Sequence, residues 1–410
     1  MMAASASVPA PHAILKALAS HCPDRVALVD PADNERVLGE TPRRFTYAQA
    51  DRAVGAIAAR LREIGLAPGS VVAVKMPNVA ANVLILLGIM RAGMIAAPLP
   101  LLWHRADCAA ALTACGARAI ITCGTVAGID HATLALDIAA ELFPIRAVCG
   151  FGCGTIDGIV PFDDLLSGSD EHSDPLLFQD AAAPVSVVTF DMTVDGIVPV
   201  GRDDAQLLAG GRLVRQRGEI GPGAVILSTI ALSTYAALSA AFVPWLLDAG
   251  TLVLAHPFDP DAIGEQVEAE SCSILILPEA MVPVLPNAGW LQPSDIRRTV
   301  ISLWRAPERL AAAAPWTRRD VTLVDLAAFG ETGLLAARRP VGDWPAPWKA
   351  GPLTIADGGP QCAHVAQTQA GTLGIRGLLA APRFNPYGTG SVAAEAAIVP
   401  TKDGHIDTGY

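Results

Sequence analysis

An alternation of strand-like and helix-like apolar runs is the feature that most restricts the fold of this chain. Between residues 25 and 121, short runs such as "VVAVKMP" alternate with longer ones such as "NVAANVLILLGIMRAG", in which Gly93 predicts a helix end. Thr46 is a good N-cap for another of these helices. Strands without polar faces, linked by helices, are typical of parallel sheets covered on both sides, so we predict an α/β fold with doubly wound sheets.

The pattern changes twice along the chain. A polar stretch with several prolines, residues 157–184, separates the first α/β series from a second one. After Arg339 the chain turns to short strands rich in glycine and proline, which favours a small β-rich unit. We therefore predict an α/β subdomain over residues 1–180, a second over 181–338 and a small β-rich subdomain over 339–410.

Charge and composition exclude several classes of protein. The net charge is −11, and no cluster of Lys and Arg is interleaved with aromatic residues, so no nucleic-acid partner is expected. The uncharged run 224–247 has the length of a membrane span, but it divides into a strand and a helix with a glycine stop, which predicts a buried βαβ unit instead. The eight cysteines form no CxxC pair and no zinc-type spacing, which predicts buried thiols in a reducing compartment, the cytoplasm.

The stretch 187–202, "VVTFDMTVDGIVPVGR", runs from an apolar strand into a glycine-containing segment, as a phosphate-binding loop does. It also carries two carboxylates, Asp191 and Asp195. A carboxylate about 4 Å from a phosphate oxygen costs on the order of 4 kcal/mol at an effective dielectric of about 20, although a bridging Mg²⁺ would reverse the sign. A nucleotide site, a degenerate nucleotide site and a simple turn are the three interpretations.

Several segments resemble, in order, the N-terminal domain of the adenylate-forming superfamily of acyl-CoA synthetases, luciferases and peptide-synthetase adenylation domains. Residues 45–100 resemble the opening of that domain, "AAFGETG" (327–333) resembles its Tyr-Gly-x-Thr-Glu motif, and "DGHIDTGY" (403–410) resembles its Trp-x-x-Thr-Gly-Asp motif. The resemblance implies two doubly wound subdomains with a small β-rich one, ATP or AMP with Mg²⁺ as cofactors, and a small carboxylic acid or acyl group as ligand.

The resemblance places the family's phosphate loop, Thr-Ser-Gly-Thr-Thr-Gly-x-Pro-Lys-Gly, on the stretch 187–202. Aligned on Gly196, its hydroxyl and glycine positions fall on residues 191–195; aligned on Pro199 and Gly201, its lysine falls on Val200. The lysine is therefore missing in both alignments, and Arg202 is either a displaced cation or a capping or surface residue. The expected phosphate-side residues are Asp191, Thr193, Asp195 and Gly196.

Further departures fall on the adenine, ribose and metal positions. Leu303, Trp304 and Arg305 stand where the family has small residues, and bulky side chains there fill or reshape a pocket. Tyr410 replaces the ribose-binding aspartate, and a phenol cannot accept two hydrogen bonds from a diol as a carboxylate does. Glu331 aligns with the magnesium-binding glutamate. The remaining expected cofactor-binding residues are Trp304, Gly330, Glu331, Thr332 and Tyr410, with Glu331 as the metal ligand.

The expected substrate pocket follows from the same resemblance. Thr234 and Tyr235 lie where the family has the aromatic gate of its acyl pocket, and Trp304 and Phe329 complete the set. No residue is assigned as catalytic.

Three hypotheses about function follow. The first is an acyl-CoA synthetase-like homologue, impaired in ATP use, that acts in ligand binding or regulation. The second is an active adenylate-forming acid–thiol ligase that needs the family's mobile C-terminal domain. That domain is absent from this sequence, whose end at Tyr410, inside a motif, suggests a trimmed chain. The third is an interaction scaffold in which Trp304 and its neighbours close the old pocket.

Overall fold

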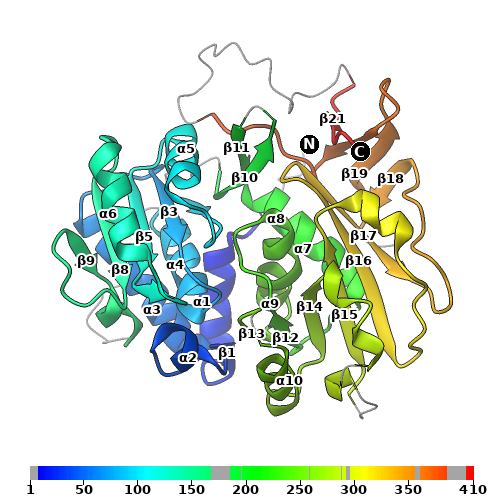
Figure 1. Ribbon diagram of the computed structural model, residues 1–410, viewed down its shortest axis with the longest axis horizontal. Helices are drawn as coiled ribbons and strands as arrows, with labels where there is room; N and C mark the ends of the chain where they lie inside the picture. Colours follow the sequence, from blue (N-terminus) through cyan, green and yellow to red (C-terminus); the bar gives the residue numbers. More distant parts are fainter. Residues whose placement is uncertain are drawn as a thin grey trace, which may run out of the picture.

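The computed structural model describes residues 8–167, 185–194, 196–257, 259–287, 289–291, 296–355, 361–385 and 403–410. Two large twisted sheets with flanking helices stand side by side, and a smaller sheet lies at the end where the described C-terminal residues are found (Figure 1). This arrangement confirms the predicted α/β class.

The first sheet has seven strands in the order β11-β10-β4-β3-β5-β8-β9, and all neighbours are parallel except β10 and β11. Its strands are β3 (Val71–Lys75), β4 (Ile95–Pro98), β5 (Ala119–Cys123), β8 (Ala147–Phe151), β9 (Ile159–Pro161), β10 (Val187–Thr193) and β11 (Gly196–Arg202). The helices and short elements of this half are α3 (Tyr47–Glu63), α4 (Ala80–Arg91), α5 (Arg105–Cys115), the hairpin β6 (Thr125–Val126) and β7 (Ile129–Asp130), α6 (His131–Glu141) and η1 (Asp163–Leu166).

The second sheet has eight strands in the order β17-β16-β15-β14-β12-β13-β1-β2, antiparallel only at its two ends. Its strands are β1 (Val26–Val29), β2 (Arg44–Thr46), β12 (Val225–Ser228), β13 (Thr251–Leu254), β14 (Ile274–Pro278), β15 (Arg298–Trp304), β16 (Val321–Phe329) and β17 (Gly333–Arg339). Two helices near the N-terminus, α1 (Pro11–His21) and α2 (Asn34–Leu38), lie against elements of the first half: α1 against α3 and α4, and α2 against β6. The helical segments of the second half are α7 (Asp204–Gly218), α8 (Tyr235–Ala237), η2 (Leu238–Phe242), α9 (Val243–Leu247), α10 (Pro260–Ala269), η3 (Glu279–Met281), η4 (Leu285–Asn287), η5 (Gly289–Leu291) and η6 (Pro307–Ala312).

The third sheet is antiparallel and has the order β18-β19-β20-β21. Its strands are β18 (Gly351–Thr354), β19 (Gln361–Gln367), β20 (Leu373–Gly377) and β21 (Ile406–Asp407). It lies within the region where the sequence predicts a small β-rich subdomain.

The two large sheets exchange strands across the boundary expected near residue 180. Strands β1 and β2 come from the first α/β series but complete the second sheet, whereas β10 and β11 follow the boundary but extend the first sheet. The sequence pattern predicts where strands and helices alternate. It does not predict which of the two sheets a strand near the boundary joins.

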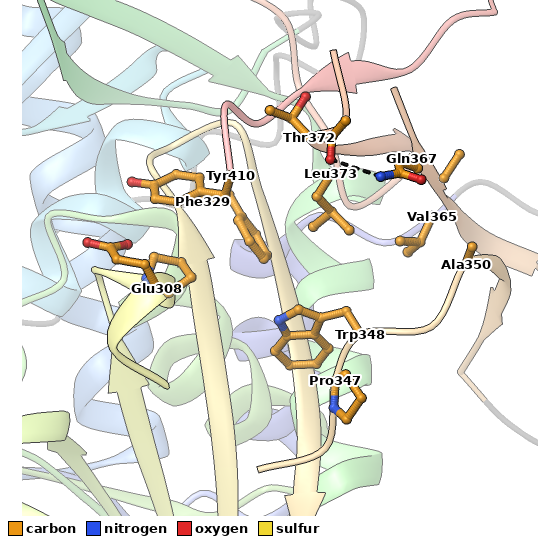
Figure 2. A pocket seen from close by; sticks show the side chains of 13 residues that line it. Glu308, Phe329, Pro347, Trp348, Ala350, Val365, Gln367, Thr372, Leu373 and Tyr410 are labelled. Carbon is orange, nitrogen blue, oxygen red and sulfur yellow. Dashed lines mark hydrogen bonds between the residues drawn. The ribbon is translucent and has the colours of Figure 1, made fainter. Parts of the chain in front are cut away.

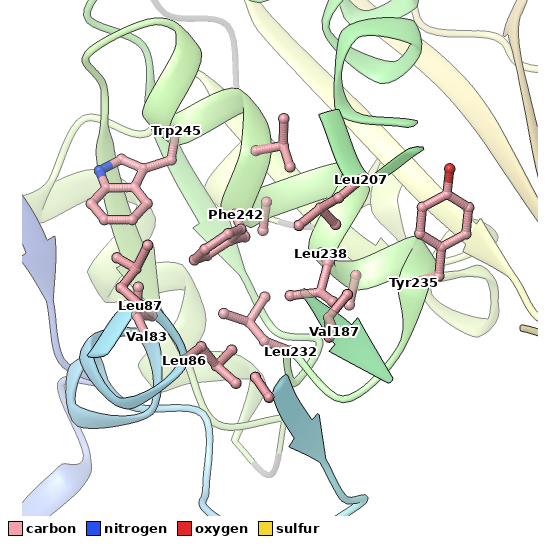
Figure 3. Close-up of a cluster of buried hydrophobic side chains, with 14 of the residues drawn as sticks. Val83, Leu86, Leu87, Val187, Leu207, Leu232, Tyr235, Leu238, Phe242 and Trp245 are labelled. Carbon is pink, nitrogen blue, oxygen red and sulfur yellow. The ribbon is translucent and has the colours of Figure 1, made fainter. Parts of the chain in front are cut away.

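A continuous apolar core joins the two sheets. Figure 3 shows Val83, Leu86 and Leu87 of α4 facing the side chains of η2 and α9, among them Phe242 and Trp245. The uncharged run 224–247 thus forms β12 and three short helical segments inside the protein. In the part of the chain that the structure describes, no helix combines the length and the apolar character that a bilayer span requires.

Two local predictions from the sequence, the N-cap at Thr46 and the buried cysteines, can be compared with the structure. Thr46 caps α3 through a reciprocal pair of hydrogen bonds with Gln49, as its predicted N-cap role requires. All eight cysteines are free thiols and all but Cys22 are buried, which confirms the prediction of buried, unpaired cysteines.

Candidate functional site

The stretch that resembles a phosphate loop is a tight β-hairpin. β10 and β11 pair without interruption from Val187–Arg202 to Thr193–Gly196, which leaves a connection of two residues. Val194, one of these two, is fully exposed, and Asp195 lies outside the described residues. Gly196 has a φ of +117°, which only glycine adopts without strain. The backbone groups of β10 and β11 that face each other are therefore engaged in a strand ladder and are not presented to a phosphate.

Asp191 points from this hairpin toward the turn after β16. Its carboxylate accepts a hydrogen bond of 3.1 Å from the backbone N–H of Glu331. It also covers Gly330, where an added Cβ would lie 2.2 Å from Asp191 Oδ2 and where φ is +56°. Burial raises the pKa of Asp191, and the N–H bond from Glu331 opposes this rise. Three of the expected nucleotide-site residues are thus brought together, around a hydrogen bond of the chain itself.

Glu331 faces the protein interior. Its side chain is buried, and Oε2 accepts a hydrogen bond of 2.7 Å from the backbone N–H of Tyr235 at the start of α8. Burial raises the pKa of this carboxyl to about 7, against the lowering effects of the Tyr235 N–H and of Arg202. The expected metal ligand therefore has one carboxylate oxygen committed to the chain itself.

Arg202 is the cation of this region, and it is buried. Its guanidinium lies 3.6 Å from the centre of the Tyr235 ring and donates to the backbone carbonyl of Glu331 and, at 3.4 Å, to Thr189 Oγ1. We call Thr189, Arg202, Tyr235 and Glu331 the Arg202 cluster. The sequence left open whether Arg202 was a displaced cation, a cap or a surface residue; its contacts exclude the surface position.

Trp304 is held inside the protein by a polar cluster. Its indole Nε1 donates to Asp325 Oδ1 at 3.0 Å, and Arg339 holds the same carboxylate through two hydrogen bonds of 2.8 and 2.5 Å. All three side chains are buried. The scaffold hypothesis requires Trp304 to close the old pocket, and that role stays a prediction, because a buried indole whose N–H is bonded can still fill such a space.

A cavity of about 550 Å³ lies where β16, η6 and the small sheet meet (Figure 2). Phe329 and Tyr410 stand edge to face on one side of it, with ring centres 5.7 Å apart. Trp348 and Pro347 lie below them in Figure 2, and Leu373 lies across from them. The described residues that line this cavity are Pro307, Glu308, Phe329, Pro347, Trp348, Ala350, Val365, Ala366, Gln367, Gly371, Thr372, Leu373 and Tyr410.

The expected substrate-pocket residues are not brought together. Of the four, only Phe329 is among the lining residues described for this cavity. Thr234 caps α8 through a 3.2 Å hydrogen bond from Ala237 N, and Tyr235 is buried beneath Arg202. Thr332, expected on the cofactor side, donates to the carbonyl of Phe329 at 2.6 Å and so shapes the turn after β16. Trp348 was missed because it lies in no segment that resembles a family motif, and Glu308 was missed because it follows the positions assigned in its segment, Leu303 to Arg305.

The described side chains offer no ready metal centre. Across those residues, no group of three or more His, Cys, Asp or Glu side chains is placed to hold a metal ion. Glu331 remains a predicted metal ligand, but the Tyr235 N–H and the surrounding burial do not fit an exposed magnesium-binding carboxylate.

Comparison with known proteins agrees with this fold. The family model described as AMP-binding enzyme matches residues 15–152. Long-chain fatty acid transport protein 1 of Bos taurus is 32% identical over 175 residues, which is 42% of this chain and 24% of that protein; the Homo sapiens protein is also 32% identical, over 177 residues. The match thus spans about a quarter of the length of these relatives.

Solved structures extend the likeness to nearly the whole chain. A putative long-chain-fatty-acid CoA ligase from Rhodopseudomonas palustris gives a TM-score of 0.73 at 18% identity, covering 99% of this chain and 96% of that one. MbtA of Mycobacterium smegmatis gives 0.72 at 19% identity, covering 98% and 72%. The chain has the fold of the adenylate-forming N-terminal domains, and its first third also matches the AMP-binding enzyme family in sequence. Its fold is that of an acyl-CoA synthetase-like N-terminal domain, as the sequence motifs predict.

Proposed function

We propose that this chain is an acyl-CoA synthetase-like homologue that does not hold ATP in the manner of its family and acts by binding a small organic ligand. The observation that carries the proposal is the hairpin of β10 and β11, in which the residues aligned with the family's phosphate loop are paired with each other up to Thr193 and Gly196. The family loop supplies amides, hydroxyls and a lysine to the phosphates. Here the corresponding backbone is paired strand to strand.

The energetic cost of opening this hairpin supports the proposal. Each backbone hydrogen bond that a phosphate displaced would cost about 1 kcal/mol net, and several would have to break at once. The carboxylate of Asp191 would then oppose the phosphate by on the order of 4 kcal/mol at about 4 Å. Arg202 cannot offset this repulsion without leaving the Tyr235 ring and the carbonyl of Glu331.

The turn after β16 supports the proposal independently. The family motif Tyr-Gly-x-Thr-Glu can be laid without a gap on Phe329 to Thr332, which puts Gly333 at the position of the metal-binding glutamate. An added Cβ on Gly333 would lie 3.2 Å from Ile375 Cδ1 and 3.4 Å from the carbonyl oxygen of Leu379. A glutamate has little room there, so this alignment also leaves the metal position without a usable carboxylate.

The test is a calorimetric titration of ATP into the protein, with and without Mg²⁺. We expect no binding in either condition. Asp191→Thr should not restore it, because removing one charge does not unpair β10 from β11. Asp137→Asn, an exposed carboxylate on α6, serves as the matched control. Magnesium-dependent binding that Asp191→Thr abolishes and Asp137→Asn leaves intact would overturn the proposal.

Magnesium-dependent binding of ATP that Asp191→Thr abolishes would favour an active adenylate-forming ligase. One observation supports this alternative: the carboxylate of Asp191 lies beside the turn after β16, where Mg²⁺ could bridge it to phosphates. An active ligase would catalyse carboxylate-dependent exchange of pyrophosphate into ATP once a C-terminal domain of the family is supplied. The fold alone does not decide between these activities, because function depends on the site.

A further inference from the structure

The cavity beside β16 combines aromatic rings with a single carboxylate. Phe329, Trp348 and Tyr410 contribute three rings, and Glu308 contributes the carboxylate. In Figure 2 the carboxylate of Glu308 and the hydroxyl of Tyr410 lie on the same side of the cavity, and the indole of Trp348 lies below the Phe329 ring. A volume of about 550 Å³ is within the usual range for a small-molecule site.

The charge around this cavity is negative. Among the lining residues that the structure describes, Glu308 is the one carboxylate, and none is Lys, Arg or His. The hydroxyl of Thr372 is turned to Asp407 Oδ1, at 2.6 Å, so its proton is already donated. Burial and the nearby carboxylates of Glu308 and Asp191 all raise the pKa of the Tyr410 phenol.

The cations close to these residues do not line the cavity. Lys349 stands between the lining residues Trp348 and Ala350, and Arg305 acts on Asp191 and Glu331, but both are exposed to solvent and neither is among the lining residues described. A ligand carboxylate or phosphate in the cavity would therefore meet Glu308 without a cation among the lining side chains. A positively charged group would meet Glu308 together with the electron-rich faces of the rings.

We propose that this cavity binds an organic cation, an ammonium group joined to a planar or branched apolar body, with the ammonium between Glu308 and Tyr410 and the body against Trp348 and Phe329. This inference rests on the proposed function, because it takes the cavity as the ligand site of a protein that does not adenylate. It departs from the small carboxylic acid that the family resemblance implies. Aromatic faces with an adjacent carboxylate are a recurrent way to recognise ammonium groups.

Three probes that share one ring system test the charge preference in the full chain. Tryptamine is a cation, tryptophol is its neutral counterpart and indole-3-acetate is an anion. By calorimetric titration we expect tryptamine to bind about tenfold more tightly than tryptophol, with indole-3-acetate the weakest. Equal affinities, tightest binding of the anion, or no binding of tryptamine at millimolar concentration would each overturn the inference.

Two variants locate the preference in the cavity. Glu308→Gln should reduce the advantage of tryptamine over tryptophol to about threefold while leaving tryptophol binding unchanged. Trp348→Ala should weaken both probes about tenfold or more. The matched control is Glu35→Gln on α2, an exposed glutamate remote in sequence, which should leave all affinities as they are. Loss of the preference in the control, or its persistence in Glu308→Gln, would place the binding elsewhere and refute the inference.

The same titrations separate this inference from the proposed function. Magnesium-dependent ATP binding with pyrophosphate exchange would refute the proposed function, whatever the order of the three indole probes. Equal binding of the three probes, with no ATP binding, would refute the charge preference alone.

Discussion

The buried carboxyl of Glu331 makes the stability of this protein depend on pH in a calculable way, and Glu331→Gln isolates the effect. The glutamine has the same shape and can still accept the N–H of Tyr235. It cannot ionise. Any difference between the two proteins that changes with pH therefore reports the titration of Glu331, because every other group titrates in both.

The magnitude follows from the pKa. An ordinary glutamate has a pKa of 4.5, and burial raises that of Glu331 to about 7. The carboxyl loses its proton near pH 4.5 in the unfolded chain and near pH 7 in the folded one. Between these two pH values the folded state therefore binds more protons than the unfolded state. The free energy of unfolding therefore falls as pH rises through this window, by about 1.4 kcal/mol per pH unit and roughly 3 kcal/mol in all.

Urea unfolding of both proteins at intervals from about pH 3 to 8 measures the effect. We expect the free energy of unfolding of the wild type, minus that of Glu331→Gln, to decrease by roughly 3 kcal/mol across this range. A difference that stays constant with pH would mean that Glu331 is solvated and open to a metal ion. A difference that increases with pH would mean that Arg202 lowers the pKa instead. Either result would refute the reasoning about the Arg202 cluster.

Two further substitutions test the geometry of the site by the same unfolding assay. Trp304→Phe removes the indole donor to Asp325 and should lower the free energy of unfolding by about 1–2 kcal/mol; no change would mean that this hydrogen bond does not form in solution. Gly330→Ala should cost about 2–4 kcal/mol, because the added Cβ displaces Asp191 in addition to straining a positive φ. Gly342→Ala, at a φ of +84° with nothing within 4 Å, carries the strain alone and should cost about 1 kcal/mol; equal losses in the two glycine variants would refute the contact with Asp191.

The regular part of the fold could be predicted from local pattern. Apolar runs without polar faces predicted the parallel strands β3, β4 and β5, and the end of α4 lies close to Gly93, as expected. The hairpin was the harder case. Its signal was the β-branched residues on both sides of Asp195-Gly196, which favour two paired strands and a tight turn. The likeness to a phosphate loop pointed to the same residues for a different reason.

The contacts of the site could not be predicted, because they join residues far apart in the chain. The guanidinium of Arg202 bonds a residue 129 positions away, and Glu331 bonds the N–H of a residue 96 positions away. Trp304 was expected at a nucleotide pocket from its place in a motif. Its direction is set by Asp325 on the neighbouring strand β16, a partner that no spacing rule indicates.

The two-residue connection between β10 and β11 also bears on the history of this protein. The ten positions of the family's motif are all present in this stretch, so the chain differs from the family in how its backbone is paired and not in its length. Regaining a phosphate-wrapping loop here would require the strand ends to separate as well as new side chains. Substitutions that separate them would remove ladder hydrogen bonds before any contact with a phosphate could repay the loss. The paired hairpin therefore acts as an energetic barrier to the return of the loop.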